Sequence, residues 1–209
     1  MKILIVSGFL GAGKTTFIKR LARNVDQRFA ILENEYGAAG IDGARLGQNR
    51  QGTQKNVWEM TEQCICCIGK KDFAASVLTI ANVVDPEYLI VEPTGVGSLA
   101  RIIENLRQIE YERIQLLSPV TIVDVYSYRR YMAEYPELYQ DQIRSADTII
   151  VSKTEACQAE EKQRIQKFLQ EINSQAKIIT DYASTMTRED YQSLLLGSRY
   201  EKKVQDTQS

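Results

Sequence analysis

The sequence predicts an α/β fold in which helices flank a mostly parallel sheet in three layers. Two observations support this prediction. Apolar runs of strand length alternate with amphipathic runs of helical length along the chain, and this alternation is typical of a parallel sheet wrapped by helices. The first apolar run, 2–7, is followed by a glycine-rich loop and then by a helical pattern, an order that is typical of phosphate-binding loops.

The elements are expected in a regular order. Strands are predicted where short apolar runs are bounded by turn residues, and helices where apolar residues recur at helical spacing. The predicted strands are 2–7, 28–33, 56–60, 87–92, 119–124, 147–152 and 177–180. The predicted helices are 14–25, 70–84, 98–109, 126–132, 136–145, 157–173 and 187–196.

The segment 8–16 fits the pattern G-x-x-x-x-G-K-[ST], which predicts a P-loop nucleoside triphosphatase. Glycines let successive backbone N–H groups turn towards a phosphate, and the following helix adds the positive end of its dipole. Lys14 is expected to reach the β- and γ-phosphates, and the hydroxyl of Thr15 to hold Mg²⁺. The alternative is a glycine-rich turn that only caps a helix. The other residues predicted to bind nucleotide in this loop are Gly11, Ala12, Gly13 and Thr16.

Composition limits the classes of protein that this chain can represent. With 209 residues and 44% hydrophobic content, one sizeable core is expected, so we predict a single nucleotide-binding domain over 1–196 and a polar, flexible tail over 197–209. The net charge of −1 gives no basic field that would attract nucleic acid. No apolar run approaches the length of a membrane span, and a signal peptide's layout is missing. A cytoplasmic protein without nucleic-acid or membrane partners is expected.

Acidic and glycine residues stand at the expected ends of several strands, where ligands bind in open α/β sheets. Glu92 follows the apolar run 88–91, the position of a carboxylate that orients Mg²⁺ or its water shell. Gly95 can offer its backbone N–H to the γ-phosphate and let its loop change shape on hydrolysis. Alternatively, Glu92 caps the helix that begins near Ser98. Asp124 is equally compatible with a site residue and with a simple helix cap.

A cysteine cluster, Cys64-Ile65-Cys66-Cys67, is the second strong feature of the chain. The sequence contains four cysteines and no histidine, which excludes imidazole from any site that the chain builds. Thiolates suit Zn²⁺, Cu(I) or an iron–sulfur cluster. Three thiolates leave one position of a tetrahedral site open, which a carboxylate such as Glu35 could fill. The alternative is a set of buried, inert cysteines. Glu35 lies in the stretch 35–55, which is predicted to be a mobile functional loop. The fourth cysteine, Cys157, is expected to pack in the protein interior and to have no chemical role.

Together, segments 8–16, 33–37, 64–67, 92–95 and 152–155 resemble the CobW/HypB/UreG class of metal-related GTPases, and their order is most similar to the CobW-type branch. The resemblance covers roughly residues 1–180. It implies a nucleotide domain that uses GTP and Mg²⁺, with Zn²⁺ or a related divalent metal at Cys64, Cys66 and Cys67. It also implies delivery of metal to client proteins, or a role in cobalt and cobalamin metabolism.

The chain departs from the pattern of this class at three places. The base-reading motif Asn-Lys-x-Asp stands here as Ser152-Lys153-Thr154-Glu155. Glu155 keeps the carboxylate on a longer stem, and Ser152 is expected to lose the amide that braces the phosphate loop, so ATP stays open as an alternative to GTP. Ala38 and Ala39 stand where many relatives carry an acidic residue. The smaller C-terminal domain of CobW-type proteins has no counterpart here, which suggests a minimal form or one completed by a partner.

The function predicted from these features is a metal-responsive GTPase switch with slow intrinsic turnover. Lys14, Glu35 and Glu92 are the candidate catalytic residues, with one of the two glutamates positioning the attacking water. The expected partner is a client metalloenzyme or a corrinoid protein, and a homodimer is left open. One alternative is a nucleotide-gated adaptor whose cysteines are structural or redox-sensing. Another is an ATP-using kinase or activator.

Tyrosines at near-helical spacing are expected to pack rather than to cover a partner surface; they are Tyr126, Tyr128, Tyr131, Tyr135 and Tyr139.

Overall fold

The computed structural model describes residues 1–27, 29–33, 57–61 and 70–196. Within these ranges, seven strands form a parallel sheet in the order β3-β2-β4-β1-β6-β7-β8. The strands are β1 (Lys2–Ser7), β2 (Phe29–Glu33), β3 (Val57–Thr61), β4 (Tyr88–Glu92), β6 (Val120–Asp124), β7 (Thr148–Ser152) and β8 (Lys177–Ile179). Each agrees with a predicted strand to within about one residue at either end, which is the usual precision of such boundaries.

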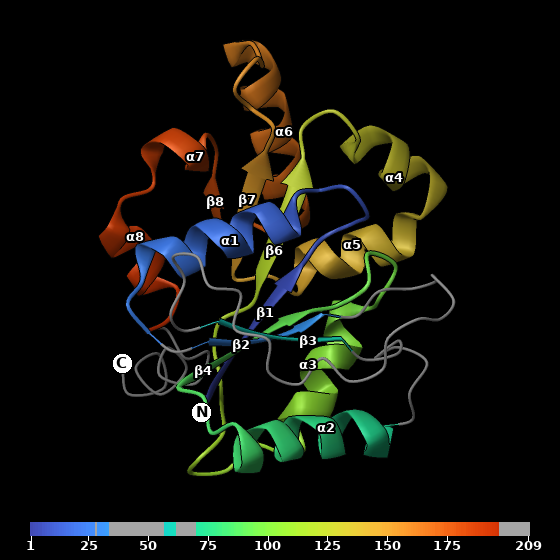
Figure 1. Ribbon diagram of the computed structural model, residues 1–209. Helices are drawn as coiled ribbons and strands as arrows, with labels where there is room; N and C mark the ends of the chain where they lie inside the picture. Colours follow the sequence, from blue (N-terminus) through green and yellow to red (C-terminus); the bar gives the residue numbers. More distant parts are fainter. Residues whose placement is uncertain (28, 34–56, 62–69, 197–209) are drawn as a thin grey trace, which may run out of the picture.

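Helices cover both faces of the sheet, which confirms the predicted three-layer α/β architecture (Figure 1). One face carries α1 (Lys14–Asn24), α7 (Tyr182–Thr185) and α8 (Arg188–Ser193). The opposite face carries α2 (Lys70–Val83), α3 (Leu99–Arg107), α4 (Tyr128–Glu134), α5 (Pro136–Arg144) and α6 (Ala159–Ile172). No helix in the described ranges is long and apolar enough to cross a bilayer.

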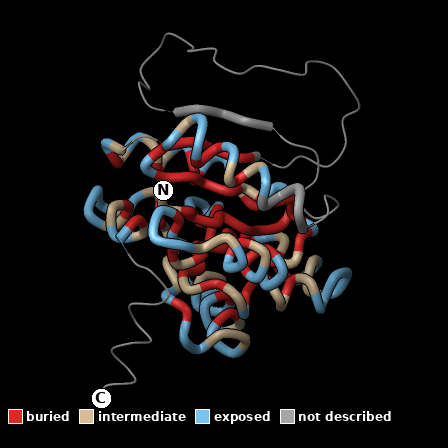
Figure 2. The backbone as a smooth tube through the Cα atoms, turned by 90° about the horizontal axis from the view of Figure 1, so that it is seen from below, coloured by how far each residue is buried: buried red, intermediate tan, exposed pale blue. Residues whose placement is uncertain are grey.

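The central strands β1, β4, β6 and β7 are buried on both faces because they lie between two helical layers. In β1, Leu4 and Val6 pack on the α1 side, whereas Ile3 and Ile5 pack on the α2–α3 side. A strand side chain points to alternate faces, so a strand buried on both faces needs a continuous apolar run. Figure 2 shows the result, with buried chain through the interior and exposed segments on the outer helices.

Two short elements were not predicted. The strand β5 (Gln115–Leu116) pairs with β1 in parallel, and α7 is a single turn that begins after Asp181. Elements of two and four residues are too short to establish a periodicity, and their position is decided by neighbours that are distant in sequence. The predicted loop 35–55 and the predicted tail 197–209 lie outside the described residues.

The strand order determines which chain segments meet at the carboxyl edge of the sheet. β1 lies between β4 and β6, and β7 follows β6. The loop that leaves β1 is therefore flanked by Glu92 at the end of β4 and by Asp124 at the end of β6. Ser152 ends β7 one strand further on. Four predicted site segments are thus brought to one edge.

Candidate nucleotide-binding site

The phosphate loop, residues 8–16, has the backbone that its glycines predict. Gly13 lies in the left-handed region with φ 97° and caps α1 without a side-chain hydrogen bond to the first turn. A Cβ on Gly8 would approach the carbonyl oxygen of Ile122 to 2.5 Å, so no larger residue fits between β1 and β6. The first N–H groups of α1 are free of a capping side chain, which is the condition for binding an anion at a helix N-terminus.

Lys14 points back over the phosphate loop. Its Nζ donates a hydrogen bond to the carbonyl oxygen of Gly8 at 3.1 Å and lies 3.9 Å from Glu92 Oε1. Burial lowers the pKa of Lys14, and the Glu92 carboxylate offsets part of that effect. A buried ammonium attracts a polyanion more strongly than an exposed one does, because the surrounding dielectric constant is lower.

Thr15 and Glu92 bring two types of oxygen ligand to one place. The Thr15 hydroxyl lies 3.1 Å from Glu92 Oε1 and 3.3 Å from Oε2. The start of α3 has its own cap, because the Ser98 side chain accepts a hydrogen bond from the N–H of Arg101. The contact between Thr15 and Glu92 joins the start of α1 to the end of β4 across 77 residues of sequence.

Gly95 lies against the phosphate loop in the segment 93–98, which we call the switch segment. A Cβ on Gly95 would stand 2.4 Å from the backbone nitrogen of Leu10. The carbonyl oxygens of Gly95 and Gly97 accept hydrogen bonds from Gln142 Nε2 at 3.1 and 2.9 Å. Gln142 was not predicted as a site residue from the sequence. The available signal was a polar residue between Tyr139 and Ile143 on the inner face of an amphipathic helix.

Ser152 contacts the phosphate loop through its hydroxyl. From the sequence, serine at this position is expected to lose the amide that braces the loop. In the structure the Ser152 hydroxyl donates to the carbonyl oxygen of Ala12 at 2.6 Å, and both residues are buried. The amide is absent, but β7 brings Ser152 close enough for its short hydroxyl side chain to brace the loop, a contact that was not predicted.

Asp124 and Lys153 form an ion pair beside this brace. Lys153 Nζ lies 2.8 Å from Asp124 Oδ2, and Asp124 also accepts from the N–H of Tyr126 and the hydroxyl of Ser127, each at 2.9 Å. Burial alone would raise the pKa of Asp124, but the hydrogen bonds from Lys153, Tyr126 and Ser127 outweigh it and hold the pKa below its ordinary value. Asp124 therefore makes both the turn contacts of a helix cap and a contact to the predicted base-reading motif.

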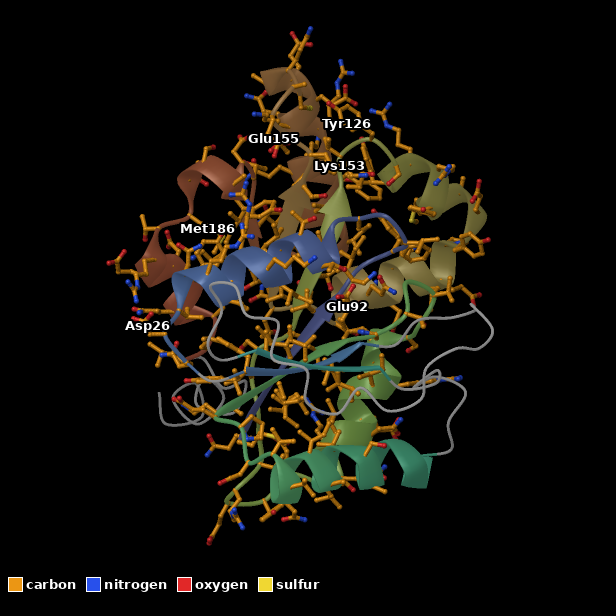
Figure 3. The ribbon with its side chains drawn as sticks, viewed as in Figure 1. Asp26, Glu92, Tyr126, Lys153, Glu155 and Met186 are labelled. Atoms are coloured by element: carbon orange, nitrogen blue, oxygen red, sulfur yellow. The ribbon has the colours of Figure 1, made fainter. Side chains whose placement is uncertain are left out.

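The remaining predicted residues of the nucleotide site differ in exposure. Gly11, Thr16 and Glu155 are exposed, whereas Ala12 is buried. Figure 3 shows Lys153, Glu155 and Tyr126 in one part of the view and Glu92 in another. The predicted phosphate-contacting and base-reading groups are thus separated along the carboxyl edge of the sheet.

The predicted metal ligands Glu35, Cys64, Cys66 and Cys67 lie outside the described residues. Within the described ranges, no cluster of Cys, Asp and Glu side chains is arranged to hold a metal ion. Cys157 is half-buried and packs against the core beside α6, as predicted.

The tyrosines of 126–139 mostly pack, as expected. Tyr128 and Tyr139 are buried, and Tyr131 lies against the Phe9 ring with centroids 4.6 Å apart. Tyr126 and Tyr135 remain exposed.

Sequence comparisons agree with the geometry of this edge. The CobW/HypB/UreG nucleotide-binding domain matches residues 2–180. The zinc chaperone YeiR of Escherichia coli is 30% identical over 178 residues, which cover 84% of this chain and 53% of the relative. The zinc chaperone CobW of Pseudomonas aeruginosa is 27% identical over 86% of this chain and 56% of its own length. The chain thus spans about half the length of these curated relatives.

Solved structures share the fold. Zn(II)-bound YjiA GTPase from Escherichia coli superposes with a TM-score of 0.65 at 23% identity, over 90% of this chain and 58% of the other. Hydrogenase maturation factor HypB from Archaeoglobus fulgidus gives a TM-score of 0.59 at 17% identity, over 94% of this chain and 89% of the other. The match over residues 2–180, together with the phosphate loop and its partners at the edge of the sheet, shows that the chain belongs to the CobW/HypB/UreG family and carries its nucleotide-binding domain.

Proposed function

We propose that this chain binds and hydrolyses GTP and couples its nucleotide state to the binding or delivery of a divalent metal, zinc or cobalt, to a client metalloenzyme or a cobalamin pathway. The observation that carries the proposal is the convergence of Lys14, Thr15 and Glu92 at the uncapped N-terminus of α1. The zinc-chaperone names of the sequence relatives support the metal part.

The phosphates of the nucleotide would occupy the loop 8–16. The N–H groups at the start of α1 and the Lys14 ammonium would then face the β- and γ-phosphates. Because Lys14 is already held over the loop by Gly8, little side-chain ordering is needed when the nucleotide enters. The glycine conformations at the loop leave its backbone close to the bound phosphate.

The oxygen atoms of Thr15 and Glu92 fit Mg²⁺, which prefers hydroxyl, carboxylate and phosphate oxygens. When bound, Mg²⁺ would neutralise charge on the β- and γ-phosphates. Thr15 and Glu92 would exchange their present contact for contacts to the ion or its water shell. Glu92 would thereby transmit the presence of nucleotide from α1 to β4 and to the switch segment.

The base would be read by the segment 152–155. Glu155 is exposed at the end of β7, where its carboxylate could accept the N–H groups of guanine, and Lys153 is positioned by Asp124. Competition of unlabelled GTP and ATP for a fluorescent guanine nucleotide tests this part of the proposal. A preference for ATP would reject the assignment of guanine to Glu155.

The transition metal would bind Cys64, Cys66 and Cys67, with Glu35 as the fourth ligand, because three thiolates and a carboxylate suit Zn²⁺ and its neighbours. A Cys66→Ser variant should bind Zn²⁺ more weakly than the wild type in a competition with a chromophoric chelator. Cys157→Ser is the matched control, because this half-buried cysteine packs beside α6. An unchanged zinc affinity in Cys66→Ser would reject the site.

We further propose that residues 1–196 act as one nucleotide-binding unit in the cytoplasm, that the client is a metalloenzyme or a corrinoid protein, and that no nucleic acid or membrane takes part. Analytical ultracentrifugation with GDP and with a non-hydrolysable GTP analogue tests whether the chain forms a homodimer. Capture of a metalloenzyme that exchanges zinc with the chain would support the client assignment.

Steady-state GTP hydrolysis tests the whole proposal. Reduced, metal-free protein should hydrolyse GTP slowly, and stoichiometric Zn²⁺ should change the rate. Lys14→Ala should lose nucleotide binding, while Lys19→Ala, an exposed lysine of the same helix, should retain it. Normal GTP affinity in Lys14→Ala would reject the phosphate-loop assignment. A rate that is unaffected by Zn²⁺ would separate the metal from the nucleotide cycle and favour an adaptor.

A further inference from the structure

The Gln142 side chain is a buried amide that contacts the switch segment directly. Gln142 lies on α5 and is 1% exposed. Its Nε2 donates to the carbonyl oxygens of Gly95 at 3.1 Å and of Gly97 at 2.9 Å. A single side chain thus holds two peptide groups of the segment that follows Glu92.

These two bonds determine which way the switch segment turns its N–H groups. The peptide bonds of the described residues are trans, so the N–H of Val96 points opposite to the carbonyl of Gly95, and the N–H of Ser98 opposite to that of Gly97. Since both carbonyls point to Gln142, both N–H groups point away from it. The close approach of Gly95 to Leu10 also sets the distance between this segment and the phosphate loop.

Helix α5 and the preceding helix α4 also contact the phosphate loop. The Phe9 ring lies 5.0 Å from the ring of Tyr139 on α5 and 4.6 Å from that of Tyr131 on α4, centroid to centroid. The Tyr131 hydroxyl donates to the carbonyl oxygen of Leu10 at 2.9 Å. Helix α5 therefore contacts both segments that would enclose the γ-phosphate, and α4 contacts the phosphate loop.

Two buried oxygen atoms in this region lack a hydrogen-bond partner in the described structure. Within the described residues, Gln142 Oε1 and Ser7 Oγ are buried and have no hydrogen-bond partner. Ser7 is paired in register with Thr121, whose hydroxyl donates to the backbone carbonyl of Gln142 at 3.0 Å. A buried acceptor without a donor costs about 1–3 kcal/mol. Within the described residues, the hydrogen bonds of the Gln142 amide are therefore the two that it donates to the switch segment.

We propose that Gln142 is a positioning residue that orients the switch segment for the γ-phosphate and thereby sets the preference of the site for nucleoside triphosphate over diphosphate. This inference depends on the proposed nucleotide function. Gln142 touches no phosphate in this mechanism. It acts by holding the backbone on either side of Val96, and so the place of Gly95 against the phosphate loop; the N–H of Gly95 would face the γ-phosphate, a group that a diphosphate lacks.

The test compares Gln142→Met with Asn173→Leu. Methionine has nearly the length of glutamine and no donor. Asn173 is the matched control, because its Nδ2 also donates to backbone carbonyls, those of Ile143 and Ala146 at 2.8 and 2.9 Å, and neither carbonyl lies in the switch segment. Affinities for GDP and for a non-hydrolysable GTP analogue are measured by fluorescence titration, and hydrogen exchange of residues 93–98 is followed in nucleotide-free protein.

Gln142→Met should bind the GTP analogue about tenfold more weakly relative to GDP. This ratio corresponds to the free energy of about one hydrogen bond. Its switch segment should also exchange faster. Asn173→Leu should leave both readouts unchanged. Gln142→Leu, which also removes the amide donor and places no charge in this buried position, should reproduce the loss and serves if the methionine variant does not fold. Equal weakening for the two nucleotides, or none, would overturn the inference.

Failure of the proposed function gives a different result. If wild-type protein binds neither nucleotide, the nucleotide proposal fails whatever the variants do. The exchange rates then still decide the role of Gln142, because unchanged exchange of 93–98 in Gln142→Met would show that this side chain does not hold the segment.

Discussion

Replacing Ser152 by alanine removes one hydroxyl that joins the end of β7 to the phosphate loop. The Ser152 hydroxyl donates to the carbonyl oxygen of Ala12 at 2.6 Å, and it lies 3.4 Å from the carbonyl oxygen of Val123. Alanine keeps the Cβ and the strand geometry, so the variant tests the hydrogen bond and little else. Ala12 directly precedes Gly13, whose left-handed conformation begins α1, so the lost brace acts where the loop turns.

The expected cost follows from burial. Ser152 and Ala12 are each 2% exposed, so water does not replace the lost donor, and removing one partner of a buried hydrogen bond costs about 1–3 kcal/mol. The loop is also less well positioned before nucleotide binds. Affinity for GTP and for GDP should fall together by up to about tenfold, the equivalent of 1.4 kcal/mol, because the brace supports the part of the loop that both nucleotides use.

Urea unfolding followed by circular dichroism gives the stability change from the midpoint at constant slope, and fluorescence titration gives the two affinities. Ser7→Ala is the matched control, because this buried serine at the end of β1 has no hydrogen-bond partner in the described structure. It should be neutral or slightly stabilising, since an unpartnered buried hydroxyl contributes nothing to offset its lost hydration. If Ser152→Ala matched Ser7→Ala in stability and in both affinities, the bracing argument would be refuted.

Two further predictions follow from the same edge of the sheet. Gly95→Ala places a Cβ 2.4 Å from the Leu10 nitrogen; overpacking against backbone costs about 1–3 kcal/mol, so the switch segment should shift and affinity for a GTP analogue should fall relative to GDP. Val96→Ala, half exposed in the same segment, should bind both as the wild type does, and an equal result for Gly95→Ala would contradict the close contact. The pKa of Asp124 is held below its ordinary value, so its stabilising effect is complete above about pH 4 and is lost as the pH falls through the folded-state pKa. In Asp124→Asn, the free energy of unfolding, measured by urea titration, should therefore fall less steeply with decreasing pH below about pH 4 than in the wild type. The same pH dependence in both proteins would show that the carboxylate is not stabilised in the fold.

The predictable part of the site is local in sequence. One segment contains the glycine pattern, Lys14 and Thr15. Glu92 ends an apolar run that is predicted to be a strand. Patterns of this kind depend on neighbours a few residues apart. The contacts of Ser152 with Ala12 and of Gln142 with Gly95 join residues 140 and 47 positions apart. No pattern within a segment indicates such a contact, and the two contacts were not predicted for this reason.

The sequence by itself determined the class of fold, the position of the phosphate loop and the family, because alternating apolar periodicity and a glycine-lysine-threonine motif are properties of consecutive residues. Only the tertiary structure decided what surrounds that loop. The strand order β4-β1-β6-β7 places Glu92 beside Thr15 and Ser152 beneath Ala12, and the packing of α5 on the sheet brings Gln142 to the switch segment. Strand order and helix packing result from burying apolar surface on both faces of one sheet, and the polar contacts at its edge follow from that packing.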